Sequence, residues 1–182
     1  MRHKNIFRSI LLIISIFLIT SCSNNSAMKP EDFKNKEPRL VIEEYMAGNV
    51  KAWGVLQNRS GKVTRQFTAD LNGTWDGKQL ILKEKFNWDD GEVQDREWII
   101  NKIDENNYEG TAGDVVGKAK GYSYGPAFKF EYVLLVPVKG REMKITFDDW
   151  IFMQDERVAI NRATMTKFGI KVAELTVMFV KD

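Results

Sequence analysis

Histidine and cysteine are almost absent from this sequence: each occurs once, as His3 and Cys22. A domain C-terminal to both residues has no disulfide, no thiol nucleophile, no Ser-His-Asp triad and no His or Cys metal ligand. A calcium site made of carboxylates alone would still be possible, but no loop shows the regular acidic spacing of such sites. A glycine-rich phosphate loop is also missing. We therefore expect no metal and no cofactor, and we assign no catalytic residue.

The sequence also lacks an apolar run long enough to cross a membrane as a helix. Its longest run, residues 10–19, has about ten residues, whereas a membrane-spanning helix needs roughly 20. Three basic residues precede the run, and the small residues Thr20 and Ser21 follow it. This arrangement predicts a secretory signal peptide over residues 1–21 that is removed from the mature protein.

Residues 19–22, Ile-Thr-Ser-Cys, resemble the lipobox of bacterial lipoproteins. The resemblance implies that Cys22 receives a lipid and becomes the first residue after cleavage, and two acyl chains hold a protein stably on a bilayer. In lipoproteins of this kind an aspartate after the cysteine favours the inner membrane. Ser23 occupies that position here, so we expect the outer membrane and its periplasmic face. The alternative is a plain signal peptide with a chance cysteine nearby.

Neither sign of charge dominates the chain. It has 27 Lys+Arg and 25 Asp+Glu, and three of the basic residues would leave with the signal peptide. This balance gives no reason to expect nucleic acid as a partner. The polar residues 22–36 predict a flexible tether, and residues 37–182 are enough for one domain with its own core.

From residue 50 onward, short runs rich in β-branched and aromatic residues alternate with polar residues and turns. We predict strands near residues 50–58, 62–75, 78–88, 92–103, 107–119, 127–138, 143–154, 157–167 and 171–180. Tight turns between them indicate an antiparallel meander, which closes into a barrel because closure removes exposed edges. The expected fold is therefore all-β, a single up-and-down barrel of eight to nine strands. A short helical segment within residues 33–46 would plug one end.

Turn lengths predict how neighbouring strands pair. A two-residue turn at Asp76-Gly77 would place Leu71 opposite Leu82. A three-residue turn at residues 89–91 places Glu84 opposite Arg96. Alternation along the strands turns the face that contains these residues toward the interior. Glu84 and Arg96 should then lie side by side inside the barrel, among aromatic side chains.

One further predicted hairpin contains Asp149 and Arg162. A two-residue turn at residues 155–156 would place these two residues opposite each other inside the barrel. A turn one residue longer would reverse the face and place Asp148, Trp150 and Asn161 inside instead.

Inward charges allow three interpretations. An ion pair can fix the register of the barrel, since unpaired buried charges cost several kcal/mol. An arginine at the end of an aromatic pocket can instead bind a ligand carboxylate or phosphate. A buried carboxylate with a raised pKa (Glu84, Asp114 or Asp149) could also be catalytic. The predicted ligand pocket comprises Phe67, Glu84, Phe86, Trp88, Arg96, Trp98, Phe147, Asp149 and Arg162.

Four glycines, Gly110, Gly113, Gly117 and Gly121, lie close together in one predicted strand region. They predict bulges and tight coiling of the kind that barrel closure needs. A portal for a ligand is the alternative.

Several short segments together resemble an uncharacterised family of Gram-negative lipoproteins. They are Trp53-Gly54 and residues 86–91, 96–98, 108–117, 147–150, 161–163 and 167–169, and the resemblance extends from about Phe33 to the C-terminus. It implies a lipocalin-like barrel without an established activity. Genes of this family often neighbour genes for fatty-acid-modifying enzymes, which suggests a lipid or fatty-acid-like ligand.

Three functions are consistent with these features. We expect a membrane-anchored periplasmic protein that binds or carries a small apolar or lipid-like ligand in its barrel. The second hypothesis is a structural or interaction lipoprotein of the cell envelope whose barrel is filled by side chains. The third is an enzyme that modifies lipids with carboxylates, which we rank below the two non-enzymatic functions. The sequence does not identify a protein partner.

Overall fold

The structure, a computed structural model, describes residues 27–138 and 140–182. The predicted signal peptide and Cys22 lie outside these residues, as do residues 22–26 of the predicted tether. None of the helices in the described ranges is long and apolar enough to span a bilayer.

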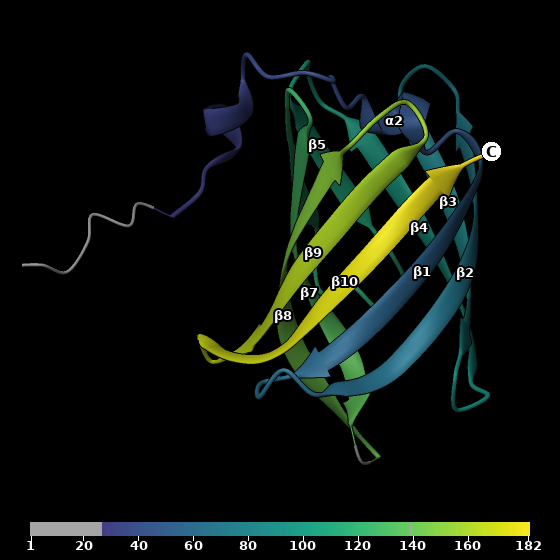
Figure 1. Cartoon of the computed structure of the whole chain (residues 1–182), viewed down its shortest axis with the longest axis vertical. Helices are drawn as coiled ribbons and strands as arrows, with labels where there is room; N and C mark the ends of the chain where they lie inside the picture. The colour runs from purple at the N-terminus through teal and green to yellow at the C-terminus, as the bar shows by residue number, and fades with distance from the viewer. Residues whose placement is uncertain (1–26, 139) are drawn as a thin grey trace, which may run out of the picture.

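Ten antiparallel strands form a closed up-and-down barrel, which confirms the predicted fold class (Figure 1). Each strand pairs with its neighbours in the sequence, and the first strand closes the ring by pairing with the last. The strands are β1 (Gly48–Asn58), β2 (Val63–Trp75), β3 (Gln79–Trp88), β4 (Val93–Lys102), β5 (Asn107–Thr111), β6 (Ala119–Tyr124), β7 (Ala127–Val138), β8 (Arg141–Met153), β9 (Val158–Lys167) and β10 (Ile170–Lys181).

The number of strands is ten because the single strand predicted over residues 107–119 does not exist. β5 ends at Thr111, and residues 112–118 form a loop before β6 begins. A turn at Gly113 and Asp114 interrupts the ladder, and Gly117 adopts a φ of 77°, which favours glycine. Gly113 and Gly117 therefore lie in a loop between two strands, whereas Gly110 and Gly121 lie within β5 and β6.

The predicted pairing of β3 with β4 is confirmed, with Glu84 opposite Arg96. The predicted pairing of β2 with β3 is wrong by two residues, since Leu71 lies opposite Glu84. The turn is wider than two residues because Asp76 Oδ1 accepts hydrogen bonds from the backbone N–H groups of Lys78 and Gln79, at 2.8 and 2.7 Å. A slip of two residues keeps the same face inward, so the predicted interior of these strands is correct.

The predicted pairing of Asp149 with Arg162 is wrong, because Asp149 lies opposite Ala163 and Ile151 lies opposite Asn161. The turn is longer than predicted, and Asp155 Oδ1 holds it by accepting two backbone hydrogen bonds. A slip of one residue exchanges the faces of β9. Asn161 is consequently buried inside the barrel, whereas the Arg162 side chain lies outside and is 68% exposed. The alternative register, which placed Asp148, Trp150 and Asn161 inside, is correct for Asn161 only, since Asp149 still faces inward.

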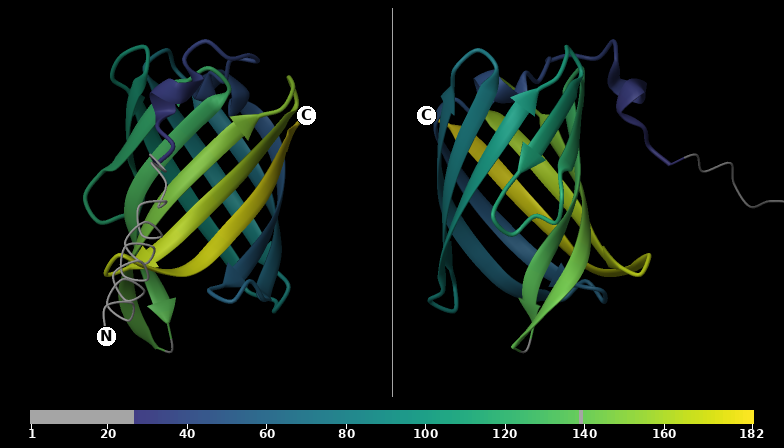
Figure 2. Two further views of the ribbon diagram at one scale, coloured as in Figure 1. Left: turned by 60° about the vertical axis from the view of Figure 1, so that its left-hand side comes forward. Right: turned by 180° about the vertical axis from the view of Figure 1, so that it is seen from behind.

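A single helical turn, α2 (Ile42–Tyr45), closes one end of the barrel (Figure 1), as predicted for this region. Its residues Ile42 and Tyr45, with the following Met46, belong to the hydrophobic core. Gly73 of β2 allows this close approach, because a Cβ there would lie 1.9 Å from the Met46 carbonyl oxygen. At the opposite end, the described residues form hairpin turns (Figures 1 and 2).

A short 3-10 helix, η1 (Pro30–Phe33), lies within the segment predicted as a tether. It packs on the outside of the barrel rather than at its end. The ring of Phe33 lies 6.0 Å from that of Trp150 and 5.5 Å from that of Phe152, measured between centroids. This contact accounts for the burial of Trp150 on the outer face of β8.

Candidate ligand-binding cavity

The barrel encloses a cavity of about 400 Å³. Ile42 and Met46 line it at the α2 end, and its walls continue to Arg65, Glu92 and Pro137 near the opposite end. Most of its lining is aromatic or aliphatic. The barrel is therefore hollow, which the sequence alone did not establish.

Eight of the nine residues predicted to form a pocket line this cavity. They are Phe67, Glu84, Phe86, Trp88, Arg96, Trp98, Phe147 and Asp149. Arg162 does not, because it points outward and lies 3.6 Å from Glu174 on β10. The prediction that Arg162 would provide a positive charge inside the barrel is therefore wrong.

β7 supplies lining residues that the sequence reasoning missed: Phe128, Phe130, Tyr132 and Leu134. They occupy every second position of one strand, so alternation along residues 127–138 could have identified them. Asn161 was missed for a different reason, since it depended on the register of β9.

Aromatic rings form two groups along the cavity wall. In one group, the Trp98 ring lies 5.1 Å from Phe130 and 5.2 Å from Tyr132 between centroids, and Tyr132 stacks on Phe147 at 5.1 Å. In the other group, Phe67 lies 5.2 Å from Phe86 and 4.9 Å from Trp88. Rings at these separations attract one another, and together they form rigid apolar walls.

A polar cluster lies among these rings. Arg96 donates from Nε and Nη2 to Asp114 Oδ2, at 3.1 and 2.7 Å, and its Nη1 lies 3.9 Å from Glu84 Oε2. The Tyr132 hydroxyl donates to Asp149 Oδ2 at 2.6 Å. The second oxygens of the two aspartates, Asp114 Oδ1 and Asp149 Oδ1, are buried and accept no hydrogen bond from the residues that the structure describes.

Burial changes the acidity of this cluster. It raises the pKa of Glu84 to about 7, an effect that Arg96 opposes and Asp114 reinforces. It also raises the pKa of Asp149 to about 7, against the hydrogen bond from Tyr132. Both carboxyl groups can therefore exchange a proton near neutral pH, and once ionised they are strong hydrogen-bond acceptors.

Asp114 reaches the cavity from the loop of residues 112–118, which lies between β5 and β6. β4 pairs with β5 only from Ile99 to Lys102, and β7 pairs with β6 only from Ala127 to Glu131. Beyond these short ladders, the loop of residues 112–118 covers the gap. It is joined to β7 by backbone hydrogen bonds of 2.8 and 2.9 Å, and to β4 by the Arg96–Asp114 ion pair.

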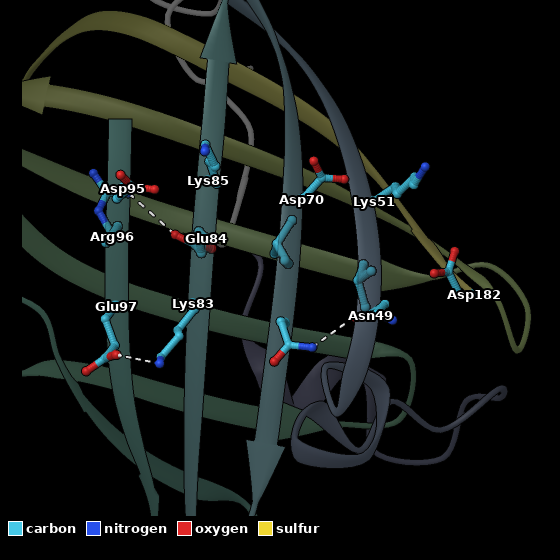
Figure 3. A pocket seen from close by; sticks show the side chains of 13 residues that line it. Asn49, Lys51, Asp70, Lys83, Glu84, Lys85, Asp95, Arg96, Glu97 and Asp182 are labelled. Carbon is cyan, nitrogen blue, oxygen red and sulfur yellow. Dashed lines mark hydrogen bonds and ion pairs between the residues drawn. The ribbon is translucent and has the colours of Figure 1, made fainter. Parts of the chain in front are cut away.

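A second, shallower hollow runs over β1 to β4 and is lined by alternating charges (Figure 3). Lys83 lies 3.8 Å from Glu97, and both side chains are more than half exposed. Glu84 and Arg96, from the same two strands, also border this hollow. Exposed pairs such as Lys83–Glu97 contribute little, and we interpret their surface as a solvated outer face.

The fold is similar to that of solved structures with little sequence identity. The S-type phycobiliprotein lyase CPES from Guillardia theta is 10% identical with a TM-score of 0.59, over 86% of this chain and 98% of that one. A protein of unknown function from the DUF3598 family of Nostoc punctiforme is 11% identical with a TM-score of 0.58. That match covers 81% of this chain and 51% of the other. At such identities the likeness shows the fold alone.

No curated protein sequence is significantly similar to this chain. One family model does match, over residues 16–181, which include every strand of the barrel and all residues that line the cavity. The chain therefore belongs to the family described as proteins of unknown function DUF3833.

Proposed function

We propose that this protein binds a small, mainly apolar ligand inside its barrel while a lipid on Cys22 anchors it to the outer membrane, on the periplasmic face. The observation that carries the proposal is the cavity of about 400 Å³ with its aromatic walls. Ligand pockets measure roughly 300–1,000 Å³ and are mostly apolar with a few polar groups, which describes this cavity.

The apolar walls of the cavity support the same function. A bound apolar molecule would gain about 0.8 kcal/mol for each methylene group that it buries against them. A structural lipoprotein with a filled barrel would have no such void, and the cavity therefore favours the binding hypothesis.

The first experiment asks whether the cavity takes up a ligand. The full chain would be titrated with phenylnaphthylamine, an apolar dye whose fluorescence rises in dry surroundings. Ala52 lines the cavity and is buried, whereas its neighbour Lys51 points outward. Ala52→Leu should weaken dye binding about tenfold by occupying the space, and Lys51→Leu should leave it unchanged. Organic extraction and mass spectrometry of the purified chain would identify a natural ligand.

Absence of dye binding, together with absence of any extracted ligand, would overturn the proposal. Equal dye affinity in the native chain and in Ala52→Leu would show that the dye binds elsewhere. A melting curve on each variant establishes that the barrel remains folded.

The membrane anchor needs its own test. Cells would be fed a labelled fatty acid, and the chain would be compared with Cys22→Ser. Label and membrane association should both be lost in the variant. A variant that keeps the label would overturn lipidation at Cys22, and an unlabelled native chain would do so as well.

A further inference from the structure

The positive charges of the cavity are already neutralised. Two arginines line it: Arg65, which lies 2.8 Å from both Asp90 and Glu92, and Arg96. Arg96 directs Nε and Nη2 at Asp114 and faces Glu84 with Nη1. Each guanidinium therefore has two carboxylate partners that balance its charge, although Arg65 Nε forms no hydrogen bond with any described residue.

The acidic groups of the cavity outnumber its arginines. Four carboxylates line it: Glu84, Glu92, Asp114 and Asp149. Asp149 has no cationic partner within salt-bridge distance among the described residues, and the hydroxyl of Tyr132 is its hydrogen-bond donor. A ligand carboxylate or phosphate placed here would meet like charge, which destabilises binding in a buried site.

Two oxygen atoms in the cluster lack a donor. Asp149 Oδ1 and Asp114 Oδ1 are buried and have no partner within residues 27–138 and 140–182, although nearly all buried polar atoms in proteins form hydrogen bonds. Arg65 Nε also lacks a partner among the described residues, but it lies outside the polar cluster, near the end of the cavity that is farther from α2. The polar centre therefore lacks donors rather than acceptors, and Asp149 is the carboxylate best placed to receive one.

We infer that the ligand carries a hydrogen-bond-donating head group, an amine or a hydroxyl and not a carboxylate or phosphate, which Asp149 Oδ1 binds while its apolar body lies along the aromatic walls. This inference rests on the proposed function and specifies its ligand class. It replaces the interpretation in which an arginine of the pocket binds a ligand carboxylate or phosphate.

Three probes with the same apolar chain test the inference: dodecylamine, dodecanol and dodecanoate. Each would compete with phenylnaphthylamine for the full chain at about pH 8, where Asp149 is largely ionised. The amine should bind most tightly, and dodecanoate about tenfold or more less tightly than the amine, since hydrogen bonds to charged groups are the strong ones. Dodecanol should lie between them.

A matched pair of variants assigns the effect to Asp149. Asp149→Asn should weaken amine binding about tenfold and leave dodecanoate binding unchanged or stronger. Asp148→Asn is the control, because Asp148 is the neighbouring residue on the outer face, 3.5 Å from Lys129. It should change neither affinity. The ranking of the three probes on the native chain does not depend on the folding of any variant.

Dodecanoate that binds as tightly as the amine would overturn the inference, and so would an Asp149→Asn chain that keeps full amine affinity. The proposed function would survive both results, because the probes would still bind. Dye binding that none of the three probes displaces would also overturn the inference alone. Failure of the dye itself to bind would instead count against the proposed function.

Discussion

Two nitrogen atoms of Arg96, Nε and Nη2, meet one oxygen atom of Asp114 at 3.1 and 2.7 Å. The two residues face each other where β4 has no ladder partner on its β5 side, and their ion pair joins the 112–118 loop to β4. A side-chain contact thus replaces part of a backbone ladder in the wall of the barrel.

Asp114→Asn should therefore loosen the wall. We expect a destabilisation of about 2–4 kcal/mol, because the change leaves Arg96 partly uncompensated in a mostly buried site. Hydrogen exchange should accelerate at residues 112–118 and at the amide of Leu135, which donates to the Asp114 carbonyl. Asp95→Asn, a change at an exposed position next to Arg96, is the control and should leave exchange unchanged. An equal acceleration of exchange across the whole barrel in Asp114→Asn would contradict a local role for the Arg96–Asp114 ion pair.

Stability should fall as pH rises from about 5 to 8. The folded pKa values of Glu84 and Asp149, both about 7, lie above their ordinary values of 4.5 and 3.8. The native state therefore holds more protons than the unfolded state between these values, and it loses this advantage as pH rises through 7. Arg96 opposes the effect, whereas Asp114 and Asp148 reinforce it.

Urea unfolding at several pH values measures this effect, which should be on the order of 2–4 kcal/mol. The double variant Glu84→Gln with Asp149→Asn should flatten the profile over the same range. A native profile that rises toward pH 8 would show that neither carboxyl group is protonated in the fold.

The stability that the α2 turn contributes should change with pH in the opposite direction. Glu43 of α2 is buried, and it accepts hydrogen bonds from Lys102 and from the Tyr108 hydroxyl. Burial alone would raise its pKa, but these hydrogen bonds and the charge of Lys102 outweigh burial and lower it. The stability that Glu43 contributes is thus present above about pH 4.5 and is lost as pH falls through its lower folded pKa.

Glu43→Gln should destabilise the chain by about 1–3 kcal/mol near neutral pH, because Lys102 loses its charged partner. Glu44→Gln, at the exposed neighbouring position, should have no effect beyond about 0.5 kcal/mol. Equal melting temperatures for the two variants would refute a role for Glu43 in holding α2.

The close contact between Gly73 and Met46, the residue that follows α2, gives a steric prediction. A methyl group at position 73 would overlap the carbonyl of Met46, so Gly73→Ala should cost about 2–4 kcal/mol and displace α2. Gly113→Ala is the matched control, since nothing lies within 4 Å of its Cβ position. Thermal melting of both variants, with dye binding as a second measurement, would distinguish them.

Alternation along strands predicted most of the interior, and individual residues show where this reasoning failed. The two-residue error at Asp76 left Leu71 and Glu84 facing inward, because side chains repeat every second residue. The one-residue error near Asp155 turned Arg162 outward. Both errors arose from aspartate side chains that bond to the backbone of the turn, which a count of turn residues does not reveal.

The centre of the site depended on contacts that pairing rules do not describe. Asp114 lies in a loop rather than at a ladder position, so its contact with Arg96 could not be found by matching residues across strands. The cavity itself results from the way ten strands close around side chains of particular sizes. Pattern alone does not distinguish a filled interior from a hollow one.

The α2 turn makes the two ends of the barrel unequal, and this asymmetry limits what the molecule can do with its contents. Because α2 covers one end, a molecule that enters the barrel at the other end would have to leave by the same route. Transfer of a ligand from one site to another would then require the whole protein to move, or a recipient to approach the end of the barrel that lacks α2. The rate of ligand transfer would then depend on contact between the open end of the barrel and the recipient, and not on passage of the ligand through the barrel.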